Sequence, residues 1–315
     1  MKNVIACIGA LAITGVSHAA PTPIGFDVNA GGGATFQRFD INLNNDAINY
    51  LDAPGGDTFV VFDASIGGAG DAYDGAFEIG VDVGAAQAFT ITDDDGVVDV
   101  TTGPSGTRIA IDAVADGVIT PPSGFSYASE YFVFNTEPLL RVVFSVTNNT
   151  GADANVQVET GSDSGTGTGF TFASTGSGDT ALGADDTYYV IRDTIDSDPV
   201  QSYTQFGVGA PVTPSMAGRF NDDTSVLFDL SLAAGETQSL MFFAAVTDPN
   251  SPTAVADALA LITQLDGTLN ELDALGFLDG LDPAVQSTIV NYAVPAPGAL
   301  PMLVLSGLAT ARRRR

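Results

Sequence analysis

Carboxylates are the reactive side chains that this chain has in abundance. It carries 38 Asp and Glu against 10 Lys and Arg, and its single cysteine and single histidine, Cys7 and His18, stand near the start. Beyond residue 20 the chain therefore lacks the thiol and imidazole that Ser-His-Asp and Cys-His catalysis, common zinc sites and disulfides need. The chemistry left to it is binding of cations that prefer oxygen ligands, or cleavage of a glycosidic bond by two carboxylates.

One acidic turn is a candidate calcium site. Residues 93–96 read Asp-Asp-Asp-Gly, and a further aspartate follows at position 99. Closely spaced carboxylates in a tight turn can supply several hard oxygen ligands, so the expected ligands are Asp93, Asp95 and Asp99. The turn lacks the alternating acids and the terminal Glu of an EF-hand loop. A solvated hairpin turn without a cation is the alternative.

A second group of acids surrounds the strand expected at residues 187–192. The group comprises Asp179, Asp185, Asp186, Asp193, Asp196 and Asp198. These carboxylates could form an ion site or a rim that accepts hydrogen bonds from sugar hydroxyls, with Tyr188 or Tyr189 stacked on a sugar ring. They could equally be turn residues, because the short Asp side chain bonds to its own backbone. The sequence leaves both interpretations open.

The excess of acid excludes one class of partner. The formal net charge is −28, and four of the basic residues are the last four of the chain. Such a field repels the phosphate backbone of nucleic acids and favours solubility and cation binding. No nucleic-acid partner is expected.

Short apolar or alternating runs, bounded by Gly, Pro, Asn and Asp, fill most of the chain and predict β-strands. They lie at residues 35–41, 58–62, 76–83, 88–92, 97–101, 107–111, 127–135, 139–147, 154–160, 187–192, 226–232 and 239–246. The runs at 127–135 and 139–147 form the strongest pair. The turn at residues 148–151 is expected to fold the chain back into 154–160 as a hairpin. Arg141, among apolar neighbours, is expected to pair with a buried carboxylate.

The hydrophobic period changes after residue 250. Ser251 can cap a helix whose first residue is Pro252, and residues 254–265 repeat Ala and Leu at helical spacing. Two further short helices are expected before residue 290. The predicted fold class is all-β: an antiparallel β-sandwich with a few short C-terminal helices. The expected segments are a signal peptide at 1–20, the sandwich at 21–250, a helical addition at 251–293 and a sorting signal at 294–315.

The N-terminus has the pattern of a secretory signal. Lys2 gives the positive start, residues 4–16 the apolar region, and a small-residue pattern ends at Ala19. Signal peptidase is expected to cut after Ala19 or Ala20.

The C-terminus has the order of elements of a sorting signal. A proline-rich motif precedes an apolar run from 299 to 311, and four arginines end the chain. The run is shorter than the roughly 20 residues of a spanning helix, and the arginines favour the cytoplasmic side. The residues concerned are Val294, Pro295, Ala296, Pro297, Arg312, Arg313, Arg314 and Arg315. They resemble the PEP-CTERM class of bacterial sorting signals, with Ala296 where the commonest form has Glu. The resemblance implies a sorting helix and processing by an exosortase-type enzyme.

The body carries a second resemblance, of layout alone. With its Thr-Asn-Asn-Thr-Gly turn at 147–151, Ser-Gly-Asp at 177–179 and Ala-Gly-Glu-Thr at 234–237, it resembles large two-sheet sandwich modules of bacterial surface proteins and galactose-mutarotase-like sandwiches. Mutarotase catalysis uses a histidine, which the body lacks, so the resemblance implies neither activity nor site residues.

These features predict an exported cell-surface or extracellular-matrix protein without catalytic activity of its own. Its expected partners are signal peptidase, an exosortase-type enzyme and extracellular polysaccharide. It is expected in the inner membrane transiently and then at the cell surface or outside. A calcium-assisted glycan-binding module is the alternative, and a two-carboxylate glycosidase is a further one, although no acid pair stands out in the sequence. Calcium is the one cofactor considered.

Overall fold

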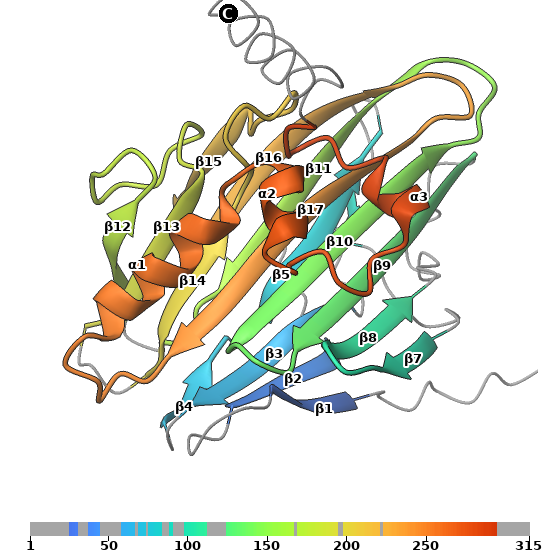
Figure 1. The fold of residues 1–315 in the computed structure, drawn as a ribbon. Helices are drawn as coiled ribbons and strands as arrows, with labels where there is room; N and C mark the ends of the chain where they lie inside the picture. Colours follow the sequence, from blue (N-terminus) through green and yellow to red (C-terminus); the bar gives the residue numbers. More distant parts are fainter. Residues whose placement is uncertain are drawn as a thin grey trace, which may run out of the picture.

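The computed structural model describes residues 25–30, 37–44, 58–66, 69–73, 75–83, 88–90, 98–111, 124–166, 169–194, 198–220 and 223–294. Two antiparallel sheets form the body (Figure 1). The first sheet, sheet A, has the order β1-β2-β3-β5-β11-β16-β15, with β4 on β3 and β6 on β5. The second sheet, sheet B, has the order β12-β13-β14-β17-β10-β9-β8-β7.

The strands of both sheets are short to medium in length. Sheet A consists of β1 Gly25–Ala30, β2 Gln37–Asn44, β3 Thr58–Ile66, β4 Ala69–Ala72, β5 Gly75–Asp82, β6 Ala88–Thr90, β11 Ala154–Asp163, β15 Met216–Phe220 and β16 Asp223–Leu232. Sheet B consists of β7 Val98–Thr102, β8 Gly106–Ile111, β9 Phe125–Phe134, β10 Leu139–Asn148, β12 Phe170–Thr175, β13 Tyr188–Asp193, β14 Val200–Thr204 and β17 Thr237–Thr247.

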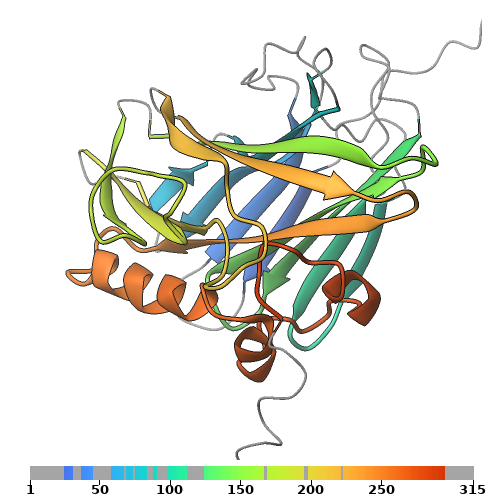
Figure 2. The same cartoon turned by 90° about the horizontal axis from the view of Figure 1, so that it is seen from above.

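The two sheets pack face to face around one apolar core, as Figure 2 shows from above. Successive residues of a strand point to opposite faces, so alternate residues supply the core. Val156 and Val158 of β11 and Phe228 of β16 meet Phe144 of β10 and Phe242 of β17 there. The prediction of an antiparallel β-sandwich is confirmed.

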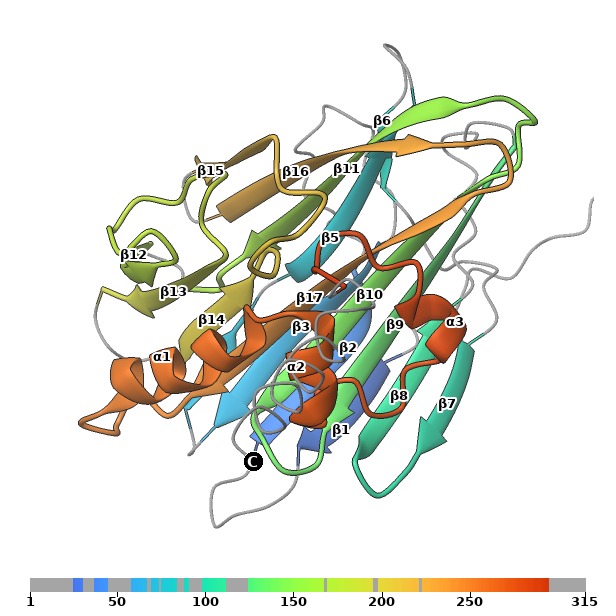
Figure 3. The ribbon, with the colours of Figure 1, turned by 45° about the horizontal axis from the view of Figure 1, so that its top comes forward.

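A second apolar cluster lies on the outer face of sheet B, beneath the three helices (Figure 3). The helices are α1 Ala254–Leu265, α2 Leu269–Ala274 and α3 Pro283–Gln286. Ile262 of α1 and Leu272 of α2 are fully buried in this cluster with Val143 and Phe243 of sheet B. The few short C-terminal helices that the sequence predicted therefore cover one sheet. The predicted signal and sorting helix lie outside the described residues.

Two local predictions are wrong. The turn at 148–151 joins β10 of sheet B to β11 of sheet A, so it does not close a hairpin. A second connection between the sheets runs from β16 to β17. The side chain of Asn148 links the two connections, because its amide donates to the carbonyls of Ala152 (2.7 Å) and Leu232 (3.1 Å). Helix α1 begins after Thr253, whose hydroxyl donates to Asp257 (2.7 Å), and Pro252 precedes the helix.

Arg141 has the buried partner that the sequence predicted. Its side chain is fully buried on the outer face of sheet B, where it forms an ion pair with Glu130 (3.4 Å). It also donates to the carbonyls of Phe277 (2.8 Å) and Asp279 (3.1 Å) in the segment after α2. Burial lowers the pKa of Arg141 to about 10, and the nearby Glu130 opposes that shift. Arg141 therefore remains charged at neutral pH and fixes the C-terminal segment to sheet B.

Candidate functional site

The outer face of sheet A, over β5, β11 and β16, carries a polar groove. Ile79 and Val81 of β5, Val156 and Val158 of β11, and Phe228 and Leu230 of β16 point into the core. The residues between them therefore point outward. The register sets Asp82, Gln157 and Asp229 side by side on three adjacent strands. The next row toward the end of the sheet pairs Asn155 with Ser231. The groove thus follows from alternation in three strands that are distant in sequence.

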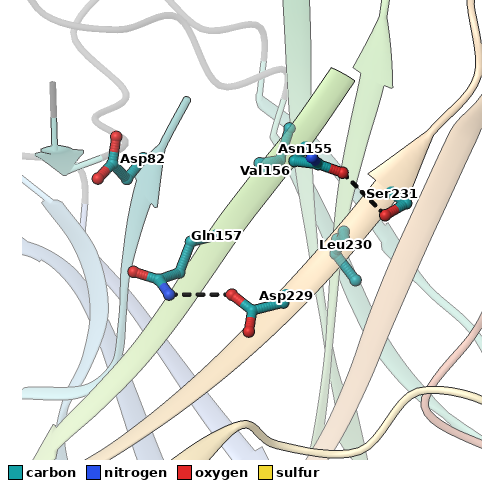
Figure 4. Close-up of a pocket in the computed structure, with 7 residues that line it drawn as sticks. All are labelled: Asp82, Asn155, Val156, Gln157, Asp229, Leu230 and Ser231. Carbon is teal, nitrogen blue, oxygen red and sulfur yellow. Dashed lines mark hydrogen bonds between the residues drawn. The ribbon is translucent and has the colours of Figure 1, made fainter. Parts of the chain in front are cut away.

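Figure 4 shows the groove and its two cross-strand hydrogen bonds. Gln157 Nε2 donates to Asp229 Oδ1 (2.9 Å), and Ser231 Oγ donates to Asn155 Oδ1 (2.9 Å). The groove has a volume of about 440 Å³. A neighbouring hollow of about 440 Å³ shares Asn155 and Ser231 and extends the polar surface to Asp153 and Glu236. Both volumes lie in the range of small-ligand sites.

The direction of one hydrogen bond fixes what the groove offers to a ligand. A carboxylate only accepts hydrogen bonds, so the Gln157 amide must turn its nitrogen to Asp229. Its oxygen then lies on the side of Asp82, as Figure 4 shows. Oδ1 of Asp82 is buried and has no hydrogen-bond partner among the described residues. Asp82 and Gln157 are thus cross-strand neighbours that both line the groove. An unpartnered carboxylate oxygen can accept a hydrogen bond or bind a cation.

A buried carboxyl lies one row further along the same face. Glu159 is 4% exposed and stands opposite Gly80, between the rows of Asp82 and Glu78. Ser225 donates a hydrogen bond to its Oε1, whereas Oε2 has no partner among the described residues. Burial raises the pKa of Glu159 above its ordinary value, and the Ser225 hydrogen bond opposes this shift. Glu159 is thus a carboxyl whose protonated form is favoured by its surroundings.

Glu78 and Glu159 form an acid pair that the sequence analysis missed. Both are buried, and they are diagonal neighbours on β5 and β11. Diagonal neighbours on one face of a sheet are about 7–8 Å apart. Glu78 stands between the core residues Phe77 and Ile79, and Glu159 directly follows the core residue Val158. These positions were readable in each strand, but the adjacency of β5 and β11 was not.

Of the three predicted calcium ligands, the structure describes one. Asp93 and Asp95 lie outside the described residues. Asp99 lies on β7 at the edge of sheet B, with its side chain 70% exposed and 3.8 Å from Arg108 Nη1. Among the described residues no cluster of three or more His, Cys, Asp or Glu could hold a metal ion. The calcium site stays a prediction.

The acids around residues 176–187 are largely turn residues. Asp186 is buried and accepts hydrogen bonds from the backbone N–H groups of Ser177 (2.7 Å) and Gly183 (2.7 Å). Asp179 accepts from Ala181 N–H (2.9 Å), and this bond lowers the pKa of Asp179. Tyr189 is buried in the core, so it does not offer a ring to a sugar. The interpretation as turn residues is the one that Asp179 and Asp186 support.

The residues of the predicted processing signals lie mostly outside the described ones. These are Ala19, Ala20, Pro295, Ala296, Pro297, Arg312, Arg313, Arg314 and Arg315. Val294 is described and is 63% exposed, two residues after the buried Tyr292. Within the described part of the chain, no helix has the length and apolar character needed to cross a membrane.

Comparison with known proteins gives fold-level matches alone. No family model and no curated protein matches the sequence. A candidate aldose 1-epimerase from Klebsiella pneumoniae has 11% identity and a TM-score of 0.45, over 77% of this chain and 92% of that one. A galactose mutarotase-like protein from Lactobacillus casei has 10% identity and a TM-score of 0.40, over 70% of this chain and 100% of that one. A candidate aldose 1-epimerase from Escherichia coli has 9% identity and a TM-score of 0.40, over 71% and 99%.

These comparisons correct one prediction. The sequence analysis expected a chain without catalytic activity, whereas the similar solved structures carry epimerase and mutarotase-like names. The statement that the chain is not an enzyme is therefore withdrawn. At 9% to 11% identity these structures are similar to this chain in fold alone, so their reactions cannot be assigned to it.

Proposed function

We propose that this chain is an exported protein that is processed at both ends and resides at the cell surface or in the extracellular matrix. The observation that supports this most is the junction at Val294. The packed body reaches to Tyr292, which is buried, and Val294 is exposed where the Val-Pro-Ala-Pro motif begins. An exosortase-type enzyme would act just beyond these buried residues.

Intact mass spectrometry of the protein from membrane, cell surface and medium tests this proposal. The expected product begins after Ala19 or Ala20 and has lost Arg315. A variant with the four terminal arginines replaced by glutamine is expected to keep its tail, because glutamine leaves no positive charge on the cytoplasmic side. Full-length protein in all three fractions of the unmodified strain would contradict the proposal.

The body of the exported protein binds a hydroxyl-rich glycan in the groove of sheet A. The supporting observation is that the cross-strand neighbours Asp82 and Gln157 line the groove, and that Asp82 Oδ1 has no hydrogen-bond partner among the described residues. Sugar hydroxyls donate to carboxylates and amide oxygens and accept from amide N–H groups. The two adjoining hollows share Asn155 and Ser231, so they suit an extended chain of sugar units. A calcium ion at Asp82 Oδ1 would serve the same arrangement.

A glycan array followed by calorimetry tests this binding. Calorimetry with calcium, and after chelation, separates a hydroxyl donor from a cation, because heat that vanishes on chelation requires the cation. Gln157→Ala and Asp82→Ala are expected to weaken binding at least about tenfold, since each removes a hydrogen-bond acceptor that lines the groove. Gln264→Ala, at an exposed position of α1, is the matched control. Equal binding by all variants would contradict the assignment to this groove.

The acid pair beside the groove gives a glycosidase reaction as the second candidate function. A carboxyl with a raised pKa can act as the general acid of such a reaction, and Glu159 has that property. The glycans that bind should therefore be incubated with the protein and assayed for new reducing ends. Glu159→Gln is expected to abolish product while leaving binding within about threefold. Product formed equally by Glu159→Gln would exclude Glu159 as the acid.

A further inference from the structure

The last residues before Val294 are inserted into sheet B. In Figures 1 and 3 the segment after α3, at the red end of the colour bar, returns across β10 toward β17. Residues 288–293, here called the C-terminal strap, form a parallel bridge at which Ile289 faces Ser239 of β17. Ser239 N–H donates to Thr288 O (2.8 Å), and Val290 N–H donates to Ser239 O (2.9 Å). The strap is therefore a neighbour of β17.

Asn291 takes the place of a strand where β14 leaves β17. The two strands pair only as far as Tyr203 and Ala244. Further along β17, Met241 N–H donates to Asn291 Oδ1 (2.8 Å), and Asn291 Nδ2 donates to Met241 O (2.7 Å). The same nitrogen donates to Gln205 O (3.0 Å), in the chain that follows β14. The side-chain amide thus presents to Met241 the donor and acceptor that a neighbouring strand would present.

The strap is also bonded on its other side. Val212 N–H donates to Val290 O (3.1 Å), Gly207 N–H to Asn291 O (2.9 Å) and Leu269 N–H to Ala293 O (3.0 Å). Gly207 lies so close to the strap that an added Cβ would come within 2.4 Å of the Tyr292 ring. The strap is held between β17 and the segment 207–212, like a strand inserted in a sheet.

The apolar side chains of the strap that pack against sheet B are buried, whereas the residue just after the strap is exposed. Ile289 and Tyr292 lie in the apolar cluster on the outer face of sheet B. The Tyr292 hydroxyl donates to Thr204 Oγ1 (2.9 Å). Val294, two residues on, is exposed. Ala293 is therefore the last residue of the strap whose backbone hydrogen bond is described.

We propose that the C-terminal strap sets the upstream limit of processing, because its backbone is bonded to sheet B. This inference rests on the proposed export and tail processing. Hydrolysis of a peptide bond adds the hydroxyl of water to the carbonyl carbon and a proton to the amide nitrogen, so an enzyme must hold the residues on both sides free of other bonds. Residues 288–293 meet that condition only when the strap leaves sheet B. Cuts therefore fall after Ala293.

Limited digestion of the folded full chain with a broad-specificity endoprotease tests the inference without the sorting enzyme. The resistant fragment of the unmodified chain is expected to end at Ala293 or later, as read by intact mass. Asn291→Ala frees the backbone of Met241 and is expected to move the end upstream of Thr288 and to speed that cut at least about tenfold, because local opening becomes easier. Asn250→Ala, in an exposed turn, is the matched control and should leave the end unchanged.

A milder variant covers the case in which Asn291→Ala does not fold. Tyr292→Phe removes only the hydroxyl that bonds to Thr204, and it is expected to give the same upstream cut at a smaller rate. Hydrogen exchange of the unmodified chain should show the N–H groups of Val290 and Met241 among the slow ones. An unmodified chain cut within 288–293 while β17 stays protected would overturn the inference.

The two proposals fail separately. A cellular product that ends before Tyr292 would overturn the role of the strap and leave tail processing standing. A cellular protein that keeps Arg315, with the digestion pattern as expected, would overturn processing and leave the strap as a structural lock.

Discussion

The outer face of sheet B is covered by other parts of the chain, whereas the outer face of sheet A carries an open groove. On sheet B, the outward residues of β10 and β17 include the apolar Val143, Met241 and Phe243 and the paired Arg141, and the helical segment and the C-terminal strap cover them. On sheet A, the outward residues of β11 and β16 include Asn155, Gln157, Asp229 and Ser231, which line the open groove. The core face of both sheets is the same in kind. The difference lies wholly in the second face, so that face decides which sheet is structural and which can meet a ligand.

A strand buried on both faces reads as a continuous apolar run, and a half-open strand reads as an alternating one. Residues 139–144 of β10 and 239–246 of β17 are buried without a break. In β16, Asp229 and Ser231 alternate with buried leucines. The comparison therefore predicts large effects on the covered face and small ones in the groove.

The largest expected effect is at Arg141. Arg141→Ala leaves the carbonyls of Phe277 and Asp279 without their buried donor. It also removes one of the two arginine partners of Glu130, which keeps Arg108 (2.8 Å). Removing one member of a buried ion pair costs about 3–5 kcal/mol, so the free energy of unfolding should fall by that amount. Denaturant unfolding measures it, with Arg192→Ala at an exposed position as control. A loss below about 1 kcal/mol would show that the covered face does not depend on this charge.

A smaller loss is expected beneath helix α1. Ile262 is fully buried between the helix and sheet B. Ile262→Ala leaves a cavity there and should lower the free energy of unfolding by about 2–5 kcal/mol. Leu275 is 53% exposed, so Leu275→Ala should change it by less than about 1 kcal/mol. Equal losses would mean that the helical cover adds no apolar stabilisation.

Glu159 is expected to give a pH-dependent gain. Its folded pKa is raised, so the folded state binds the proton more tightly than the unfolded chain. The resulting stability is complete below the unfolded pKa of Glu and is lost as the pH rises through the folded pKa. Glu159→Gln removes this loss and should stabilise the protein by about 1 kcal/mol at pH 7, with little change at pH 4. Thermal unfolding at both pH values measures the difference; a variant that is less stable at pH 7 would contradict it.

The smallest effect on stability is expected in the groove itself. Gln157 contributes one cross-strand hydrogen bond at a partly exposed position. Gln157→Ala should therefore lower the free energy of unfolding by less than about 1 kcal/mol, although it is expected to impair glycan binding. A loss as large as that of Ile262→Ala would make the groove a structural element of sheet A.

Much of the strand pattern could be predicted from the sequence, because period and turn residues are local. The expected runs at 58–62, 76–83, 107–111 and 139–147 correspond to β3, β5, β8 and β10, and the Ala- and Leu-rich run at 254–265 forms helix α1, although the predicted cap was wrong. Strands without a clear period, such as β14, were not predicted. The error at 148–151 has a specific cause. A turn sequence shows that the chain changes direction, but it does not show whether the next strand pairs with the last one or crosses to the other sheet.

The sequence by itself determined the all-β class, the lack of thiol and imidazole beyond residue 20, and the order of elements at both ends, because composition and local period need no partner. Only the tertiary structure decided that β5, β11 and β16 are neighbours, and therefore that Asp82, Gln157 and Asp229 share one groove and Glu78 lies near Glu159. It also decided that Asn291 completes sheet B beside Met241. These pairings depend on strands far apart in the chain, whose register is set by long-range backbone bonds and burial.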